Sequence, residues 1–160
     1  MTAQTQRVEV ALETVLESVT LAEEISLRIS KAAGFDEDDC HKIGMSVREG
    51  VINAFQYGNG QRRDRKIYLT FELLPEKLVI HVVDQGRGFD LEDVPDPLTE
   101  ENLLKTSGRG IFLIRTFMDE FSVGRSLSGG AEVIMAKLYP GLRSCRRKDE
   151  GKAKKGELIP

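Results

Sequence analysis

Apolar and polar residues alternate in several short segments of the chain, which is the pattern of a strand with one buried face. The first such segment is residues 8–12, near the beginning of the chain. Residues 67–72 alternate in the same way, and a short turn leads from them to an apolar run at residues 78–83. These spacings predict an opening strand and a later hairpin. Two closing strands are expected at Phe121–Val123 and Val133–Met135.

Helical spacing of apolar residues marks the segments between these strands. From about Leu16 the apolar period changes from two residues to between three and four, and Gly34 is the expected stop. A second helix is expected to begin at Asp36, whose side chain can cap the first turn, and to run to Gly58. A third helix is expected to open at Gly110.

This order of elements predicts an α+β fold, a two-layer α/β sandwich with helices on one face of a mixed β-sheet. Residues 6–140 are expected to form one domain, because 160 residues is an ordinary length for a single domain with a real core. The apolar pattern disappears between residues 90 and 106. A loop of that length in a compact domain is typical of a lid or of a disordered segment.

Composition and charge narrow the classes of protein without selecting one. The chain is 40% hydrophobic and 31% charged with a net charge of −3, so neither nucleic acid nor a membrane is an expected partner. Residues 141–160 are expected to be a basic, disordered C-terminal tail. The beginning of the chain lacks the features of a signal peptide. We therefore expect a cytoplasmic protein in which Cys40 and Cys145 are free thiols.

The first candidate site residues follow the apolar run at 78–83, in the pattern Asp84-x-Gly86-x-Gly88. An aspartate after a buried strand can offer a fixed hydrogen-bond acceptor. The glycines let the backbone turn sharply and approach a flat ligand, because no Cβ stands in the way. Taken alone, the same pattern also fits a strand that ends in a glycine turn with a capping aspartate.

A second candidate group lies on the predicted helix that ends at Gly58. Glu49, Asn53 and Tyr57 are spaced four residues apart and therefore share one helical face. That face differs from the apolar stripe of the same helix. It is either a solvated polar stripe or part of a site.

A third stretch, residues 106–110, is rich in glycine and precedes a predicted helix. Neither this stretch nor the Asp84 turn is a Walker P-loop or a Rossmann fingerprint. In their order and spacing, the three stretches resemble the N, G1 and G2 boxes of the GHKL (Bergerat-fold) ATPases. The closest resemblance is to the bacterial anti-sigma-factor serine/threonine protein kinases, over roughly Val8 to Leu138.

The resemblance implies ATP and Mg²⁺ as cofactors and gives the residues their roles. Glu49 would be the catalytic general base, and Asn53 would be a ligand of the magnesium ion. Asp84 would accept a hydrogen bond from the adenine amine, and Gly86 and Gly88 would shape the base pocket. The segment at the start of the last helix would wrap the phosphates, where free N–H groups favour anions; it comprises Thr106, Ser107, Gly108, Arg109 and Gly110.

Two positions depart from the resembled pattern. Tyr57 stands where many of these kinases carry histidine. Ala131 stands where a threonine is usual, and one lost hydrogen bond should cost about 1 kcal/mol, roughly fivefold in affinity. Nucleotide binding should survive that loss. Arg109 is as consistent with a surface cation as with a phosphate contact.

The resemblance implies a protein-serine/threonine kinase that binds a sigma factor and phosphorylates a small STAS-type anti-anti-sigma protein, as a homodimer. A sensor histidine kinase would need a suitably placed phosphoacceptor, and neither His41 nor His81 lies in such a place. The alternative is a non-catalytic adapter that binds nucleotide and works by sequestering a partner protein.

Overall fold

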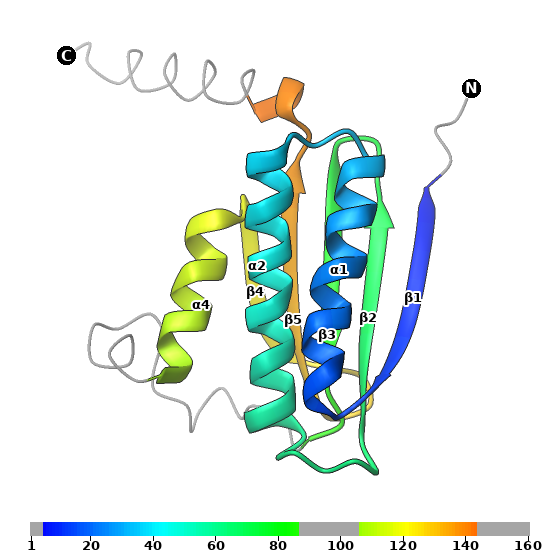
Figure 1. Cartoon of the computed structure of the whole chain (residues 1–160), viewed down its shortest axis with the longest axis vertical. Helices are drawn as coiled ribbons and strands as arrows, with labels where there is room; N and C mark the ends of the chain where they lie inside the picture. Colours follow the sequence, from blue (N-terminus) through cyan, green and yellow to red (C-terminus); the bar gives the residue numbers. More distant parts are fainter. Residues whose placement is uncertain (1–4, 87–105, 144–160) are drawn as a thin grey trace, which may run out of the picture.

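The three-dimensional structure is a computed structural model that describes residues 5–86 and 106–143 of the chain. Figure 1 shows helices packed over one face of a single sheet. Along the chain the elements are β1 (Gln6–Glu13), α1 (Leu16–Ala32), α2 (Glu37–Asn53), a π-helical turn η1 (Ala54–Gly58), β2 (Lys66–Leu73), β3 (Lys77–Val83), α4 (Thr106–Phe117), β4 (Glu120–Arg125) and β5 (Ala131–Leu138). The predicted α+β, two-layer fold is confirmed.

The sheet has the strand order β1-β2-β3-β5-β4, and each neighbouring pair in it is antiparallel. The prediction of a mixed sheet is therefore wrong. Two helices, α1 and α2, connect β1 to β2. The second helix brings the chain back to the end of β1, and β2 then runs antiparallel beside that strand (Figure 1). The crossover through α4 leaves β3 and β4 pointing the same way, but β5 lies between them. None of the described strands is therefore hydrogen-bonded to a parallel neighbour.

The core lies between the sheet and the helices. Its central side chains come from the alternating positions of β2 that the sequence predicts to be buried, from every second residue of the apolar run in β3, and from the apolar stripe of α2. The largest fully buried ones are Phe71, Ile43, Ile67, Leu69, Leu78, Ile80, Ile114 and Met135. Helices α1 and α2 approach closely, since a Cβ at Gly44 would lie 3.0 Å from Leu27 Cδ2. This packing fixes α2 across the middle of the sheet.

The helix ends follow local chemistry. Asp36 is the N-cap of α2, and its carboxylate accepts the N–H of Asp39 at 2.8 Å, as predicted. Gly34 has a φ of +97°, which suits glycine at a helix end. The predicted start of the last helix at Gly110 is wrong, because α4 begins at Thr106. The four residues before Gly110 carry no apolar period, so the pattern gave no sign of that first turn.

A charged cluster closes the end of the molecule away from the C-terminus of α2. Arg143 donates two hydrogen bonds to the buried carboxylate of Asp39, at 3.1 and 2.5 Å, and its Nε lies 3.6 Å from Asp119. Buried Lys137 donates to the carbonyl of Phe117. Arg143 falls in the segment expected to be a tail, and the rest of that segment from residue 144 lies outside the described residues.

Within the described parts of the chain, no helix is long and apolar enough to cross a membrane. The cytoplasmic location stays a prediction, as does the domain boundary at residue 140. The segment between residues 90 and 105, predicted to be a lid or a disordered loop, lies outside the described residues.

Candidate nucleotide-binding site

The predicted site residues gather at one end of the sheet, the lower end in Figure 1. There β3 ends before Asp84, β5 begins at Ala131, and α2 ends at Asn53. Helix α4 begins at this end and packs beside α2 (Figure 1). The fold thus brings together three stretches that lie about 20 to 30 residues apart in the sequence.

Asp84 is almost fully buried, with 4% of its surface exposed. Its Oδ1 accepts the backbone N–H groups of Gly86 at 2.9 Å and of Ala131 at 3.0 Å. The Asp84 N–H donates in turn to the carbonyl of Ala131 at 3.1 Å. The carboxylate is therefore held from both sides, and its orientation is fixed before any ligand arrives.

Glycines surround this aspartate because nothing larger would fit. A Cβ at Gly58 would overlap the Asp84 carboxylate, and one at Gly130 would overlap the Asp84 carbonyl. A Cβ at Gly86 would overlap the carbonyl of Gly58. Gly86 was predicted to serve close approach, whereas Gly58 was interpreted only as a helix end. Their closeness to Asp84 depends on tertiary packing, which no local pattern reveals.

Glu49 and Asn53 meet α4 at Gly110. A Cβ at Gly110 would lie 2.8 Å from Glu49 Oε2 and 3.6 Å from Asn53 Nδ2. Both polar side chains are half-buried, so this face is not fully solvated at these two residues, and their part in a site stays a prediction. Gly110 is the fifth residue of α4, so the room that it leaves beside this carboxylate and amide lies one turn into the helix, near the N-terminal end where free N–H groups favour anions.

Tyr57 does not continue that face. It lies in the π-helical turn and is 57% exposed. The four-residue spacing rule applies to an α-helix, and the wider π turn breaks it between Asn53 and Tyr57. The ring therefore adds little to the site as it stands.

The remaining predicted residues are only partly described. Arg109 is exposed on the first turn of α4. Thr106, Ser107 and Gly108 lie in the same turn, but their side chains are outside the description, and Gly88 is outside the described residues altogether. Their roles toward phosphate and base stay predictions.

Asn59, which directly follows the predicted end of the second helix at Gly58, is the most buried polar residue near the site, at 0% exposed. Its Oδ1 accepts the Gln85 N–H at 2.7 Å, and its Nδ2 donates to Thr14 Oγ1 at 2.8 Å and to the Lys66 carbonyl at 2.9 Å. An asparagine next to glycine in a polar stretch is typical of an exposed loop. The sequence offers no signal that would have marked it as buried.

Residues 5–137 match the model of the histidine kinase-like ATPase domain family. The chain belongs to this family. The match spans nearly all of the described residues and includes Glu49, Asn53 and Asp84. The predicted resemblance to GHKL ATPases is thereby confirmed, and ATP is the nucleotide that such a domain takes.

Individual relatives indicate which branch of the family the chain is similar to. The chain is 30% identical over 137 residues to the serine-protein kinase RsbW of Staphylococcus epidermidis, covering 81% of this chain and 85% of that protein. It is 29% identical over 104 residues to the anti-sigma F factor of Clostridium beijerinckii, covering 64% of this chain and 73% of that protein. The expected enzyme class, a protein-serine/threonine kinase, is confirmed by such relatives.

Solved structures agree on the fold. The chain superposes on the RsbU and RsbW domains of a Mycobacterium tuberculosis protein with a TM-score of 0.60 at 16% identity, over 85% of this chain and 33% of that one. It superposes on the mycobacterial sensor histidine kinase MprB with a TM-score of 0.52 at 12% identity, over 84% and 97%. The chain therefore spans a third of the first structure and nearly all of the second.

Proposed function

We propose that this chain is an ATP-dependent protein-serine/threonine kinase that controls a sigma factor by partner switching. It binds the sigma factor and holds it inactive, and it phosphorylates a STAS-type anti-anti-sigma protein. The observation that carries the proposal is the meeting of Glu49, Asn53 and Gly110 at the same end of the sheet as the buried Asp84. Relatives named anti-sigma F factor and serine-protein kinase support the partners.

Asp84 is the proposed acceptor for the adenine amine. Its Oδ1 already takes two backbone N–H groups, so the second carboxylate oxygen, Oδ2, is the one we assign to the base. Oδ2 faces Gly58, where the absence of a side chain leaves room for a flat base to approach this oxygen. A fixed acceptor in a buried place favours a base that carries an amine over one that carries a carbonyl oxygen.

Glu49 is the proposed general base. Its carboxylate would take the proton from the serine or threonine hydroxyl of the partner as that oxygen forms its bond to the γ-phosphorus and the bond to the β-phosphate oxygen breaks. ADP leaves, and the partner keeps the phosphoryl group. The task of the site is to position these groups, because phosphoryl transfer depends mostly on positioning and electrostatics.

The Glu49 carboxylate and the Asn53 amide lie beside Gly110, and the amide nitrogen is the Asn53 atom nearest to that glycine. Mg²⁺ prefers oxygen ligands, so Asn53 would have to offer its amide oxygen to the ion, and phosphates and water would supply the remaining ligands. We assign the amide oxygen of Asn53 to the ion. When bound, the ion neutralises charge on the phosphates. Among the described residues, no cluster of three or more histidines, cysteines or carboxylates could hold a metal ion by itself.

The test is transfer of phosphate between purified proteins. The chain is mixed with Mg-ATP and the STAS-domain proteins of its genome, and intact mass reveals a partner that gains one phosphoryl group. We expect transfer with the wild-type chain and none with Glu49→Ala, which should still bind ATP. Glu24→Gln, on the exposed side of α1, is the matched control and should transfer normally.

The alternative is the non-catalytic adapter, which the departures at Tyr57 and Ala131 favour. Binding of ATP and of a partner without transfer would establish it. Transfer at the wild-type rate by Glu49→Ala would contradict the role of that carboxylate. The proposed homodimer is tested on the same samples by light scattering, with and without the partner.

A further inference from the structure

We propose that Asn59 is a positioning residue that fixes the turn after β3 and thereby sets the selectivity of the site for adenine. It acts through Asp84, so the inference rests on the proposed role of Asp84 as acceptor for the adenine amine. Asn59 is fully buried, at 0% exposed, directly after the π-helical turn. Burying an amide is unfavourable unless its hydrogen bonds are made, so its contacts carry the argument.

The Asn59 side chain joins three parts of the fold that are distant in the sequence. Its Nδ2 donates to the hydroxyl of Thr14, which follows β1, and to the carbonyl of Lys66, the first residue of β2. Its Oδ1 accepts the N–H of Gln85, which follows Asp84 directly. Both donor hydrogens and the acceptor oxygen are thus used, and Thr14 passes the connection on to the Arg65 carbonyl at 2.7 Å.

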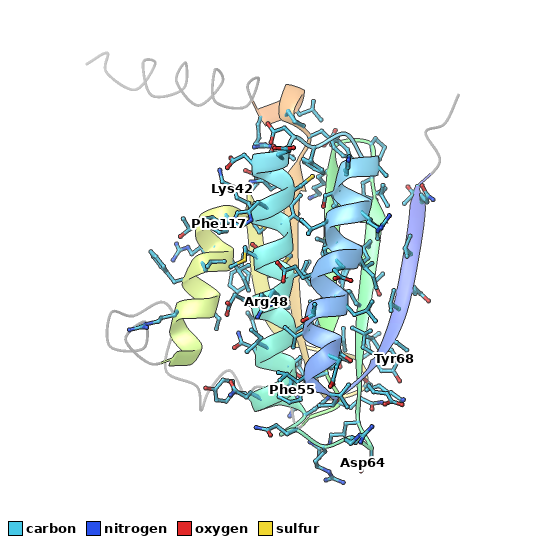
Figure 2. The ribbon with its side chains drawn as sticks, in the orientation of Figure 1. Lys42, Arg48, Phe55, Asp64, Tyr68 and Phe117 are labelled. Carbon is cyan, nitrogen blue, oxygen red and sulfur yellow. The ribbon has the colours of Figure 1, made fainter. Side chains whose placement is uncertain are left out.

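Each residue of the turn is held by a different partner. Asp84 is held by Ala131, Gln85 by Asn59, and Gly86 by the Asp84 carboxylate itself. The exposed side chain of Gln85 adds a second connection to β2, because its Oε1 accepts the Lys66 N–H at 2.6 Å. Figure 2 labels Tyr68 beside this end of the sheet, and its hydroxyl accepts from Gln85 Nε2 at 3.3 Å.

Asn59 also connects the turn to the helix that carries the proposed base. Its own N–H donates to the carbonyl of Ala54 at 2.7 Å, which lies one residue after Asn53. A displacement of the end of α2 therefore moves Asn59, and with it the N–H of Gln85. The residue links the base-binding turn to the phosphate-side helix by two short hydrogen bonds.

An asparagine is the residue type that this place needs. An aliphatic side chain of similar size would leave the part-buried Gln85 N–H and Lys66 carbonyl without this partner, at a cost below the about 1–3 kcal/mol of a fully buried group. An aspartate would keep the acceptor for Gln85 but would face the Lys66 carbonyl with a second oxygen. Asn59→Asp therefore keeps the hydrogen bond to Gln85 while it removes the amide that donates to Thr14 and Lys66.

The test compares two nucleotides that differ at the group Asp84 is proposed to read. Inosine triphosphate carries a carbonyl oxygen where ATP carries the exocyclic amine. Affinities for both are measured by calorimetry on the wild type, Asn59→Ala, Asn59→Asp and Thr14→Val. Thr14→Val is the control, because it removes one partner of Asn59 but leaves the contact to Gln85. If Asn59→Ala does not fold, Asn59→Ser is measured in its place.

We expect Asn59→Ala to lose about tenfold in ATP affinity and much less in affinity for inosine triphosphate, so that the preference for ATP shrinks. Asn59→Asp should keep the preference, since it keeps the acceptor for Gln85, and Thr14→Val should keep it too. Equal losses for the two nucleotides, or no loss, would show that Asn59 only supports the fold and would overturn the inference.

A second measurement does not depend on nucleotide. Amide hydrogen exchange is followed at Gln85 and Gly86 in the free protein, and Asn59→Ala should speed exchange at both, while Thr14→Val should not. Unchanged exchange would overturn the positioning role. If the wild type does not prefer ATP over inosine triphosphate, the proposed role of Asp84 toward adenine is wrong, and so is the inference that Asn59 sets the selectivity for adenine. Amide exchange then still decides whether Asn59 fixes the turn after β3.

Discussion

The carboxylate of Asp84 accepts a hydrogen bond from the backbone N–H of Ala131, at 3.0 Å. The donor is the main chain, so the side chain at position 131 does not decide whether Asp84 is held. The resemblance predicts a threonine at this position, whose hydroxyl would lie near the base, but the hydrogen bond that holds Asp84 does not need it. We therefore expect alanine at position 131 to weaken nucleotide binding without abolishing it.

Ala131→Thr should raise ATP affinity by roughly fivefold, because the added hydroxyl supplies about one hydrogen bond. Ala131 is 6% exposed and is the first residue of β5, where its N–H donates to the Asp84 carboxylate. Calorimetry with ATP measures the change. Ala131→Val has nearly the same shape without the hydroxyl, and a gain of the same size in that variant would contradict the explanation.

Asp84→Asn should weaken ATP binding by about tenfold or more. The amide oxygen can still accept the N–H groups of Gly86 and Ala131, so its NH₂ group would face the adenine amine, and two donors would meet. The loss of the acceptor and the buried unpaired donor both oppose binding. Binding of inosine triphosphate should fall less, because its carbonyl oxygen can accept. Equal weakening of both nucleotides would argue against the adenine contact.

The sequence predicts this site well where its residues follow local rules. Glu49 and Asn53 lie one helical turn apart, and Asp84 closes a buried strand, so their places follow from helix and strand periods. Asn59 and Gly58 could not be predicted in the same way. Their burial is decided by how the end of α2 packs against the turn after β3. Asn59 is polar, so no apolar pattern in the sequence indicates that it is buried.

The mistaken details of the fold have similar causes. Strand direction depends on how many helices connect two strands, and a pattern read locally does not show that β5 inserts between β3 and β4. The first turn of α4 has no apolar period before Ile111. Tyr57 leaves the face of Asn53 because the helix widens to a π turn there, which the four-residue spacing does not report.

Gly110→Ala should slow phosphate transfer by at least about tenfold with a much smaller effect on ATP affinity. A Cβ at this position would lie 2.8 Å from Glu49 Oε2, so the carboxylate has to move, and small displacements of a catalytic group are costly in rate. The rate is measured by intact mass of the phosphorylated partner. The backbone of α4 tolerates alanine, so the fold should be kept.

Gly124→Ala is the matched control for that variant. A Cβ at Gly124, in β4, would meet nothing within 4 Å, so the same chemical change is made in open space. It should leave both transfer and binding unchanged. Equal slowing in the two variants would mean that the effect comes from the backbone, and the assigned place of Glu49 beside Gly110 would then be wrong.

Arg143→Met should destabilise the protein by about 2 kcal/mol at neutral pH, because it removes two charged hydrogen bonds to the buried Asp39. Burial raises the pKa of the Asp39 carboxyl, but the hydrogen bonds and charge of Arg143 outweigh it and leave this pKa below its usual value. The folded state thus favours the ionised form. The stability from this pair is fully present above the usual aspartate pKa, about 4, and is lost as pH falls through the lowered value.

The difference in unfolding free energy between the wild type and Arg143→Met should therefore be largest near pH 7 and shrink below about pH 4, measured by denaturant titration at each pH. Arg62→Met is the control. Arg62 also donates two hydrogen bonds to an aspartate, Asp64, but both side chains are exposed, and exposed pairs of this kind contribute little. A difference for Arg143→Met that stays constant to pH 2, or an equal effect of Arg62→Met, would contradict the assignment. Because Asp39 lies in the first turn of α2 and Asp119 follows α4, Arg143 stabilises both helices at the end opposite the nucleotide site.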